Sequence, residues 1–249
     1  MQVEEIVLNE KRNVKLSSYV LSESDELDYI GKRPAVLILP GGGYEFCSAR
    51  EAEPVALQYL ACGYQAFVLE YSVKADAAWP NPLEDYEQAM EYIRTNADEL
   101  NVFKNRIAVI GFSAGGHLAA SAATLAENKP DACILVYAVT KGFTVDKYNH
   151  DAPDTVSAVD EDTPPCFVVA SRNDPVVSID NSIDFISALA KHDVPFESHL
   201  YSLAPHGFSV AKSTVLVPDT KINNRVKQWV PDSIEWLKEI FGDFGSFEL

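Results

Sequence analysis

The segment Ile107–Ala120, IAVIGFSAGGHLAA, constrains the fold of this chain more than any other segment. An apolar run typical of a buried strand leads into Ser113, and a run of small residues typical of a helix follows it. Glycines stand two positions before and two positions after the serine, at Gly111 and Gly115. This spacing suits a tight, strained strand-to-helix turn, in which a side chain at either glycine would meet neighbouring backbone. The segment therefore predicts a strand–turn–helix unit that exposes the hydroxyl group of Ser113.

A serine on such a turn is a candidate nucleophile. The helix that begins there directs its positive end toward an oxyanion formed by attack, and the amide of Ala114 is free to donate to it. A helix N-cap serine is the alternative, but it does not explain Gly111 or the Gly115-Gly116 pair. His117 lies on the same helix and cannot easily reach round to the serine, so we expect it to pack or to cap.

A second glycine-rich segment, PGGGY, follows the apolar run Ala35–Leu39. Successive glycines at 41, 42 and 43 give the backbone conformations that other residues rarely adopt, so their amides can face a site. A phosphate-binding loop is excluded, because no Gly-Lys-Ser/Thr follows and the spacing does not match GxGxxG. We interpret this loop as the source of a second oxyanion donor.

A serine nucleophile needs a base and an orienting carboxylate, in the order serine, acid, histidine for this type of turn. Asp174 follows the apolar run Cys166–Ala170 and is stiffened by Pro175, so we predict it as the acid. A turn or N-cap aspartate is the alternative. Asp180 and Asp184 fall inside the next predicted helix and are weaker candidates.

Five histidines are present, and His206 alone lies between the last predicted strand and the closing helix. Gly207 lets the chain turn sharply beside it, and we predict His206 as the base. The remaining histidines are assigned to packed, exposed or loop positions: His117, His150, His192 and His199.

Apolar runs rich in β-branched residues alternate with helical patterns along the whole chain, which predicts an α/β fold with a mostly parallel sheet and helices on both faces. Two N-terminal segments, Val3–Leu8 and Val14–Leu21, are expected to be antiparallel edge strands. The predicted buried strands are Ala35–Leu39, Gln65–Leu69, Ile107–Ile110, Ala132–Tyr137 and Cys166–Ala170, followed by a weaker strand at Phe196–Ser202. The predicted helices are Ala52–Ala61, Leu83–Leu100, Ala114–Ala126, Ile179–Lys191 and Ile222–Phe241, the last kinked or restarted by Pro231.

The formal net charge is −17, which repels phosphate backbones and anionic lipids. Nucleic acid and membrane surfaces are therefore not expected partners. The N-terminus lacks the basic and apolar regions of a signal peptide, and we expect a cytoplasmic protein.

The four cysteines, Cys47, Cys62, Cys133 and Cys166, form no CxxC pair and have no histidine at metal-binding spacing. Neither a metal nor another cofactor is expected. We interpret Cys62, Cys133 and Cys166 as small core residues. Cys47 follows the glycine-rich turn, so packing and a position near the site both stay open for it.

Together, PGGGY, GFSAGGHLAA, SRNDPVV and APHGF resemble the α/β-hydrolase superfamily, and within it the esterase group of acetyl-xylan esterases, feruloyl esterases and bacterial carboxylesterases. The resemblance extends from about Ala35 to Trp236. It implies Ser113, Asp174 and His206 as nucleophile, acid and base, and it implies an oxyanion hole made by the amides of Gly42, Gly43 and Ala114. It also implies an α/β-hydrolase fold without a large cap domain.

Two segments depart from the pattern of that group. Pro40 stands where the group usually has a histidine that braces the glycine loop, which leaves the donor pair among Gly41, Gly42 and Gly43 open. Tyr71-Ser72 replaces a frequent tyrosine–arginine pair, and we expect the following Val73–Pro82 to line the substrate pocket. Thr140–Pro164 is long enough to be a lid or binding loop, and an ordered surface excursion is the alternative.

The resemblance implies hydrolysis of short-chain carboxylic esters, such as acetyl esters on a sugar, through an acyl-enzyme. Amide, formamide or small-peptide hydrolysis by the same triad stays open, as does an inactive binding module. We expect residues 1–249 to form one domain, because the motifs must converge, and a homodimer stays open. Much of the negative charge falls in Asp146–Asp162, which we expect to border the site and to favour neutral substrates.

Overall fold

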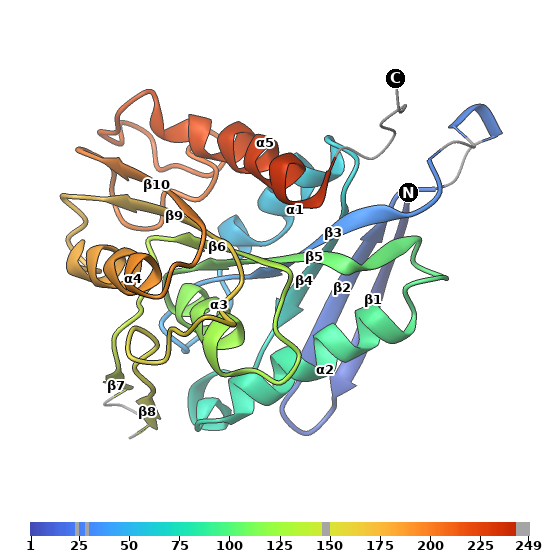
Figure 1. The fold of residues 1–249 in the computed structure, drawn as a ribbon, viewed down its shortest axis with the longest axis horizontal. Helices are drawn as coiled ribbons and strands as arrows, with labels where there is room; N and C mark the ends of the chain where they lie inside the picture. The colour runs from blue at the N-terminus through green and yellow to red at the C-terminus, as the bar shows by residue number, and fades with distance from the viewer. Residues whose placement is uncertain (23–24, 28–29, 146–149, 243–249) are drawn as a thin grey trace.

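An eight-stranded sheet forms the centre of the molecule (Figure 1). The computed structural model describes residues 1–22, 25–27, 30–145 and 150–242. The strands lie in the order β1-β2-β4-β3-β5-β6-β9-β10. They are β1 (Gln2–Asn9), β2 (Val14–Val20), β4 (Gln65–Glu70), β3 (Arg33–Leu39), β5 (Val102–Phe112), β6 (Ala132–Val136), β9 (Cys166–Ser171) and β10 (Phe196–Tyr201). Neighbours from β4 to β10 are parallel, whereas β1 and β2 are antiparallel edge strands, which confirms the predicted sheet.

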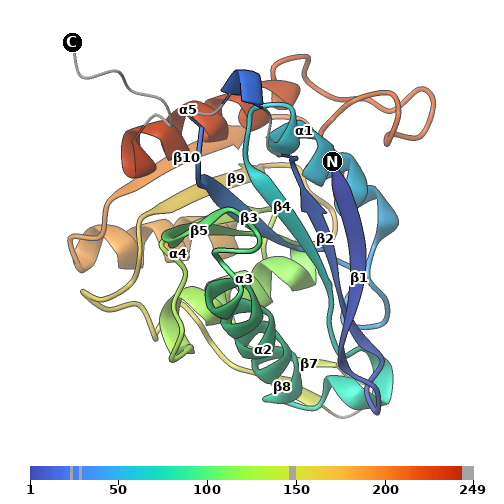
Figure 2. The same cartoon turned by 90° about the vertical axis from the view of Figure 1, so that its right-hand side faces the viewer.

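Helices cover both faces of the sheet (Figure 2). One face packs against α1 (Glu53–Leu60) and α5 (Trp229–Phe241). The other face packs against α2 (Asn81–Thr95), α3 (Ser113–Leu125) and α4 (Asp180–Lys191). Alternate residues of a central strand enter opposite cores, as Leu37 and Ile38 do. A strand buried on both faces must be apolar along its whole length, and this explains the continuous apolar runs in the sequence.

The closing helix begins later than the sequence pattern indicates, so the predicted start at Ile222 is wrong. Residues Val226–Gln228 form a 3₁₀ turn, and α5 begins only at Trp229. Pro231 is the third residue of α5 and therefore lies in its first turn. The first amides of a helix have no intrahelical partner, so proline costs no hydrogen bond there and produces no internal kink.

The cysteine predictions hold in part. Cys133 and Cys166 are buried, as expected, but Cys62 is exposed. Cys62 lies just after α1, in the turn where Gly63 has a φ of +91°. Leu60 and Tyr64 enter the core on either side, while Ala61 and Cys62 in the turn face solvent.

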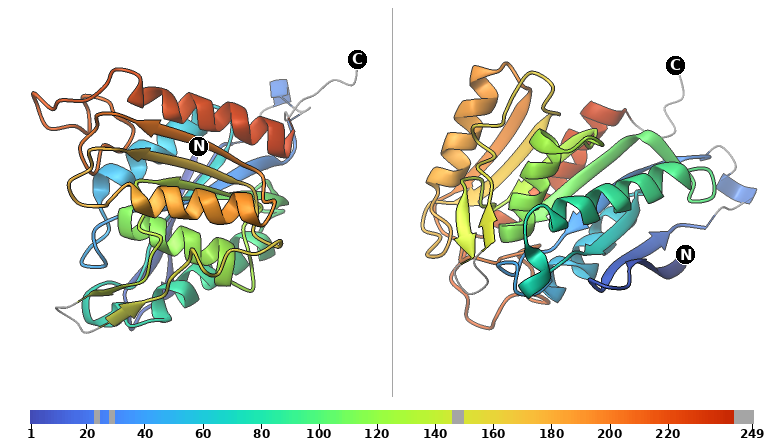
Figure 3. Two further views of the ribbon diagram at one scale, coloured as in Figure 1. Left: turned by 60° about the vertical axis from the view of Figure 1, so that its left-hand side comes forward. Right: turned by 90° about the horizontal axis from the view of Figure 1, so that it is seen from below.

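Residues 140–164 contain a small antiparallel hairpin, β7 (Phe143–Val145) and β8 (His150–Ala152), that lies apart from the main sheet (Figure 3). The predicted acidic loop falls partly on residues 146–149, including Asp146, which lie outside the described residues. Beyond the hairpin the chain returns to the start of this segment, where the Thr155 hydroxyl donates to the Thr140 carbonyl at 2.7 Å.

Candidate active site

Ser113 lies at the carboxyl end of β5, where the chain turns directly into α3. Its φ of +52° belongs to the left-handed region that residues with a Cβ rarely adopt, so the turn is strained as predicted. The flanking glycines are required by close packing. A Cβ at Gly111 would lie 2.3 Å from the Gly115 carbonyl oxygen, and a Cβ at Gly115 would lie 2.2 Å from the Leu39 carbonyl oxygen.

The structure brings Ser113 together with His206 and Asp174, three residues that the sequence analysis predicted from separate loops. Ser113 Oγ lies 2.9 Å from His206 Nε2, and His206 Nδ1 lies 2.7 Å from Asp174 Oδ2. Because a carboxylate only accepts hydrogen bonds, Nδ1 is the donor, and Nε2 is left to accept from the serine hydroxyl. This arrangement can remove the proton of Ser113 as its oxygen attacks an electrophile.

Asp174 is held in its ionised form. Its side chain is only 2% exposed, and this burial favours the neutral acid. The hydrogen bond from His206 and the amides of Val177 and Val176 outweigh that effect, so the pKa of Asp174 lies below its ordinary value. Asp174 Oδ1 accepts from Val176 at 2.8 Å and from Val177 at 3.0 Å, which fixes the carboxylate that orients His206.

The loops that carry Asp174 and His206 are joined by polar contacts. The Ala204 amide donates to Ser171 Oγ at 2.8 Å and to Asn173 Oδ1 at 3.0 Å. The Ser171 hydroxyl in turn donates to Asn173 Oδ1. These bonds tie the carboxyl ends of β9 and β10 together, so the distance between acid and base is set by two neighbouring strands.

The glycine loop after β3 offers two unused amides beside Ser113. The Gly41 amide donates to the buried Glu51 carboxylate at 2.8 Å, so it is not available to a substrate. Among the described residues, no hydrogen bond uses the amides of Gly42 or Gly43. Ala114 lies in the first turn of α3, where amides have no intrahelical partner. The candidate donors are therefore Gly42, Gly43 and Ala114.

A cavity of about 260 Å³ opens beside the serine. Two apolar side chains border it from opposite loops and are largely exposed, Phe46 and Val176. The cavity is lined by Gly42, Gly43, Phe46, Ser48, Arg50, Glu51, Ser113, Val176, His206 and Gly207. A space of this volume is smaller than the ~300–1,000 Å³ typical of sites for drug-sized ligands, which favours a small group at the serine.

Two expectations about the lining of the site are not met. Neither Val73–Pro82 nor the described part of the acidic segment lines the cavity beside Ser113. Trp79 turns instead toward the buried His117, with ring centroids 5.7 Å apart. The charged group that lines the cavity from the surface is the cationic Arg50, so an acidic rim that selects neutral substrates is not supported.

His117 and Cys47 have packing positions. His117 is fully buried, with Nδ1 2.9 Å from the Tyr44 hydroxyl and Nε2 2.8 Å from the Pro153 carbonyl oxygen. A carbonyl can only accept, so Nε2 carries the proton, and burial lowers the pKa of His117 to about 4. Burial raises the pKa of the Cys47 thiol to about 12, so Cys47 stays protonated at neutral pH.

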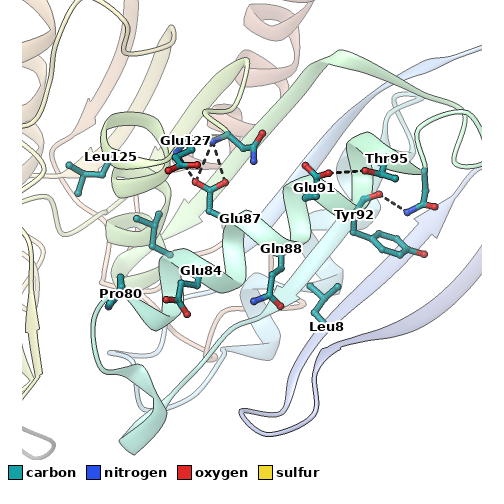
Figure 4. A pocket seen from close by; sticks show the side chains of 13 residues that line it. Leu8, Pro80, Glu84, Glu87, Gln88, Glu91, Tyr92, Thr95, Leu125 and Glu127 are labelled. Atoms are coloured by element: carbon teal, nitrogen blue, oxygen red, sulfur yellow. Dashed lines mark hydrogen bonds between the residues drawn. The ribbon is translucent and has the colours of Figure 1, made fainter.

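A larger cavity, of about 850 Å³, lies along α2 far from the serine (Figure 4). Three of its carboxylates already have partners within the protein. Glu87 accepts from the amides of Glu127 and Asn128, Glu91 accepts from Thr95, and Glu84 pairs with Arg12. The described lining of the groove contains no serine, cysteine or histidine beside these carboxylates, so it does not define a reaction.

Sequence reasoning missed Glu51 and Tyr137, which lie beneath the site. Tyr137 donates to Glu51 Oε1 at 2.7 Å, and its ring meets the His206 ring with centroids 5.0 Å apart. Neither residue belongs to a motif with fixed spacing, because the two are 86 positions apart in the chain. Only the folded sheet brings them together.

A mostly parallel sheet with helices on both faces, carrying a strained serine between a central strand and its helix, defines an α/β hydrolase. The sequence model of the BD-FAE family matches residues 28–155, slightly more than half of the chain. The chain belongs to the BD-FAE family of α/β hydrolases. The matched range includes the glycine loop and Ser113 but ends before Asp174 and His206.

Solved structures extend the similarity over nearly the whole chain. MGS-M1, an α/β hydrolase from a Medee basin deep-sea metagenome library, is 42% identical with a TM-score of 0.88, covering 96% of this chain and 98% of that one. An acetyl ester-xyloside bifunctional hydrolase from Caldicellulosiruptor lactoaceticus is 30% identical with a TM-score of 0.81, covering 96% of both chains.

The curated relatives are longer proteins. Endo-1,4-beta-xylanase B of Butyrivibrio fibrisolvens is 32% identical over 213 residues, which is 72% of this chain but 33% of that protein. This chain spans about a third to a half of the curated relatives that it matches most strongly. Among the described residues, no helix is long and apolar enough to cross a membrane.

Proposed function

We propose that this protein is a serine esterase that hydrolyses short-chain carboxylic esters, acetyl esters of sugars in particular, through an acyl-enzyme. The observation that carries the proposal is the continuous hydrogen-bonded chain from Ser113 through His206 to Asp174, with distances of 2.9 and 2.7 Å. The catalytic residues are Ser113 as nucleophile, His206 as base and acid, and Asp174 as the group that orients the imidazole.

In the first half of the reaction, Ser113 Oγ attacks the ester carbonyl carbon while His206 Nε2 takes the hydroxyl proton. The oxygen of the tetrahedral intermediate accepts hydrogen bonds from the Ala114 amide and from the Gly42 and Gly43 amides, and the amino end of α3 adds a favourable field. Collapse of the intermediate breaks the bond to the alcohol, which leaves with the proton from His206.

In the second half, water replaces the alcohol. His206 removes one proton from water, whose oxygen attacks the acyl carbon on Ser113. The second tetrahedral intermediate then expels Ser113 Oγ, which recovers its proton from His206, and the carboxylic acid leaves. Asp174 stays ionised throughout and stabilises the imidazolium that forms in each step.

The size of the cavity and the relatives support a small acyl group on a sugar. A cavity of about 260 Å³ beside Ser113 suits an acetyl or similarly short chain. The exposed ring of Phe46 offers an apolar face next to it for the alcohol part of the ester. One similar structure is named as an acetyl ester-xyloside bifunctional hydrolase, which directs the proposal to acetylated sugars.

The test is a series of p-nitrophenyl esters from acetate to octanoate, followed by acetylated xylose and by aryl formamides. We expect kcat/KM to be highest for acetate and propionate, with acetate release from the sugar. Ser113→Ala should reduce kcat by about 10⁵-fold or more. Ser121→Ala is the matched control, because this buried serine of α3 has no hydrogen-bond partner for its hydroxyl among the described residues.

Wild-type turnover by Ser113→Ala would refute the assignment of the nucleophile. A preference for formamides over esters would move the protein to amide hydrolysis with the same triad. A cytoplasmic location, a homodimer and a single domain over residues 1–249 stay proposals, which fractionation, light scattering and limited proteolysis can test.

A further inference from the structure

A buried carboxylate lies beneath the glycine loop, in a position that the motifs do not explain. Glu51 ends a short 3₁₀ turn, Ala49–Glu51, and is 3% exposed. Its Oε2 accepts from the Gly41 amide at 2.8 Å, and its Oε1 accepts from the Tyr137 hydroxyl at 2.7 Å. A buried carboxylate is costly unless hydrogen bonds satisfy it, and here each oxygen is bonded to a different segment that borders the site.

Tyr137 extends this connection to the histidine. It follows β6, and its oxygen also accepts from the Ser209 amide at 3.0 Å. Its ring meets the ring of His206 edge-on, with centroids 5.0 Å apart, and the ring of Phe208 with centroids 4.6 Å apart. A second bond closes the connection, because the Ser209 hydroxyl donates to the Arg50 carbonyl at 2.5 Å. The loop that carries His206 is therefore fixed to the Arg50-Glu51 turn.

Both backbone polar groups of Gly41 are held by hydrogen bonds. Its amide points to Glu51, and its carbonyl accepts from the Ser48 amide at 2.9 Å. A Cβ at Gly41 would lie 2.8 Å from Glu51 Oε2 and 3.0 Å from Ser113 Cβ, so this peptide is packed closely between the carboxylate and the serine. The Gly41 carbonyl shares its planar peptide group with the Gly42 amide, so fixing Gly41 restricts the direction of the Gly42 amide and, next along the chain, of the Gly43 amide.

We propose that Glu51 is a positioning residue for the reaction at Ser113. Its carboxylate holds the glycine loop in the orientation that presents the Gly42 and Gly43 amides to the oxyanion. Through its bond with Tyr137, the Glu51 carboxylate also fixes the position of the His206 loop relative to the glycine loop. The proposal rests on the proposed function, since it needs a reaction that develops negative charge on an oxygen beside Ser113.

The pKa of Glu51 reflects its burial beneath the glycine loop. Burial raises the pKa of Glu51, while the hydrogen bonds from Tyr137 and Gly41 act in the opposite direction. Burial is the larger effect, so the pKa of Glu51 lies above its ordinary value.

The test compares Glu51→Leu, Glu51→Gln and the wild type with p-nitrophenyl acetate and with a boronic acid that mimics the tetrahedral intermediate. Leucine fills a similar volume but accepts no bond, and an amide displaced by about 1 Å costs on the order of 10²-fold in rate. We expect kcat of Glu51→Leu to fall about 30- to 100-fold, with KM changed less than about threefold and boronate affinity falling with kcat. Glutamine keeps an acceptor for Gly41 and should recover most of kcat.

Asp85→Asn is the matched control, because Asp85 is another fully buried carboxylate, bonded to Arg12 and to the Ser72 amide. We expect it to lower the melting temperature without changing kcat or boronate affinity. Tyr137→Phe provides an independent measurement if Glu51→Leu fails to fold, and it should lower kcat about tenfold.

The proposal would be overturned if Glu51→Leu kept wild-type kcat and boronate affinity and only its melting temperature fell. If Glu51→Leu does not fold, the same result with Tyr137→Phe would overturn it. It would leave Glu51 as a structural carboxylate only. Failure of the proposed function gives a different result, because the wild type itself would then neither hydrolyse the esters nor react with a fluorophosphonate at Ser113.

Discussion

Gly115→Ala tests whether close backbone packing behind Ser113 sets the geometry of the site. A Cβ at Gly115 would lie 2.2 Å from the Leu39 carbonyl oxygen and 2.3 Å from the Pro40 carbonyl oxygen, whereas ordinary contact begins at 3.4 Å. Either α3 or the end of β3 must therefore move by about 1 Å. That movement separates Ser113 from the glycine loop, since the loop begins at Pro40.

The expected magnitudes follow from that displacement. Overpacking of this kind costs about 1–3 kcal/mol of stability, and the better helix propensity of alanine offsets up to about 1 kcal/mol. We expect a net loss of about 1–2 kcal/mol in the free energy of unfolding. A shift of about 1 Å at reacting groups costs on the order of 10²-fold, so kcat with p-nitrophenyl acetate should fall by about that factor.

The assay is urea unfolding followed by circular dichroism, together with steady-state kinetics. Gly31→Ala is the control, because a Cβ at Gly31 has no heavy atom within 4 Å and the residue has no positive φ. We expect its stability to change by less than about 0.5 kcal/mol and its kcat not at all. If Gly115→Ala matched the wild type in both measurements, the packing argument for the glycines of the turn would be refuted.

Two further predictions concern the acid and the buried histidine. Asp174→Asn should lower kcat by about 10⁴-fold, because it favours the wrong imidazole tautomer. Asp180→Asn, which changes an exposed residue at the start of α4, should not change kcat. His117 has a pKa lowered to about 4 by burial, so the unfolded chain binds the extra proton as pH falls below about 6.5, and stability drops with it. Between pH 7 and pH 5, the free energy of unfolding of the wild type should fall by about 2 kcal/mol more than that of His117→Gln. Urea titrations at both pH values measure this, and equal slopes for the two proteins would show that His117 is not buried in its neutral form.

Predictions from the sequence succeeded where short-range rules apply. The runs Ala35–Leu39 and Cys166–Ala170 are strands because a strand buried on both faces must be apolar throughout. The glycines around Ser113 required a tight turn, and the turn has the expected positive φ. The helix prediction failed at Ile222, because an apolar period continues through Val226 into α5, while the backbone forms a separate 3₁₀ turn at Val226–Gln228.

Predictions about the surroundings of the site failed for a different reason. Val73–Pro82 and the described part of Asp146–Asp162 follow or precede strands that end near the site, but the direction in which a loop folds depends on distant partners. Trp79 packs against His117, and the Pro153 carbonyl accepts from the same histidine. One buried side chain on α3 thus contacts Trp79 of the first segment and Pro153 in the described part of the second, and neither residue lines the cavity beside Ser113.

By itself, the sequence determined the fold class, the strained turn and the identities of Ser113, Asp174 and His206 as candidates, since each depends on residue type and spacing within a few positions. The tertiary structure decided which amides of the glycine loop are free and what lies behind them. Glu51 takes the Gly41 amide only because β3, β6 and the turn before α1 meet there. Contacts between residues far apart in the chain depend on the whole sheet, and no local pattern records them.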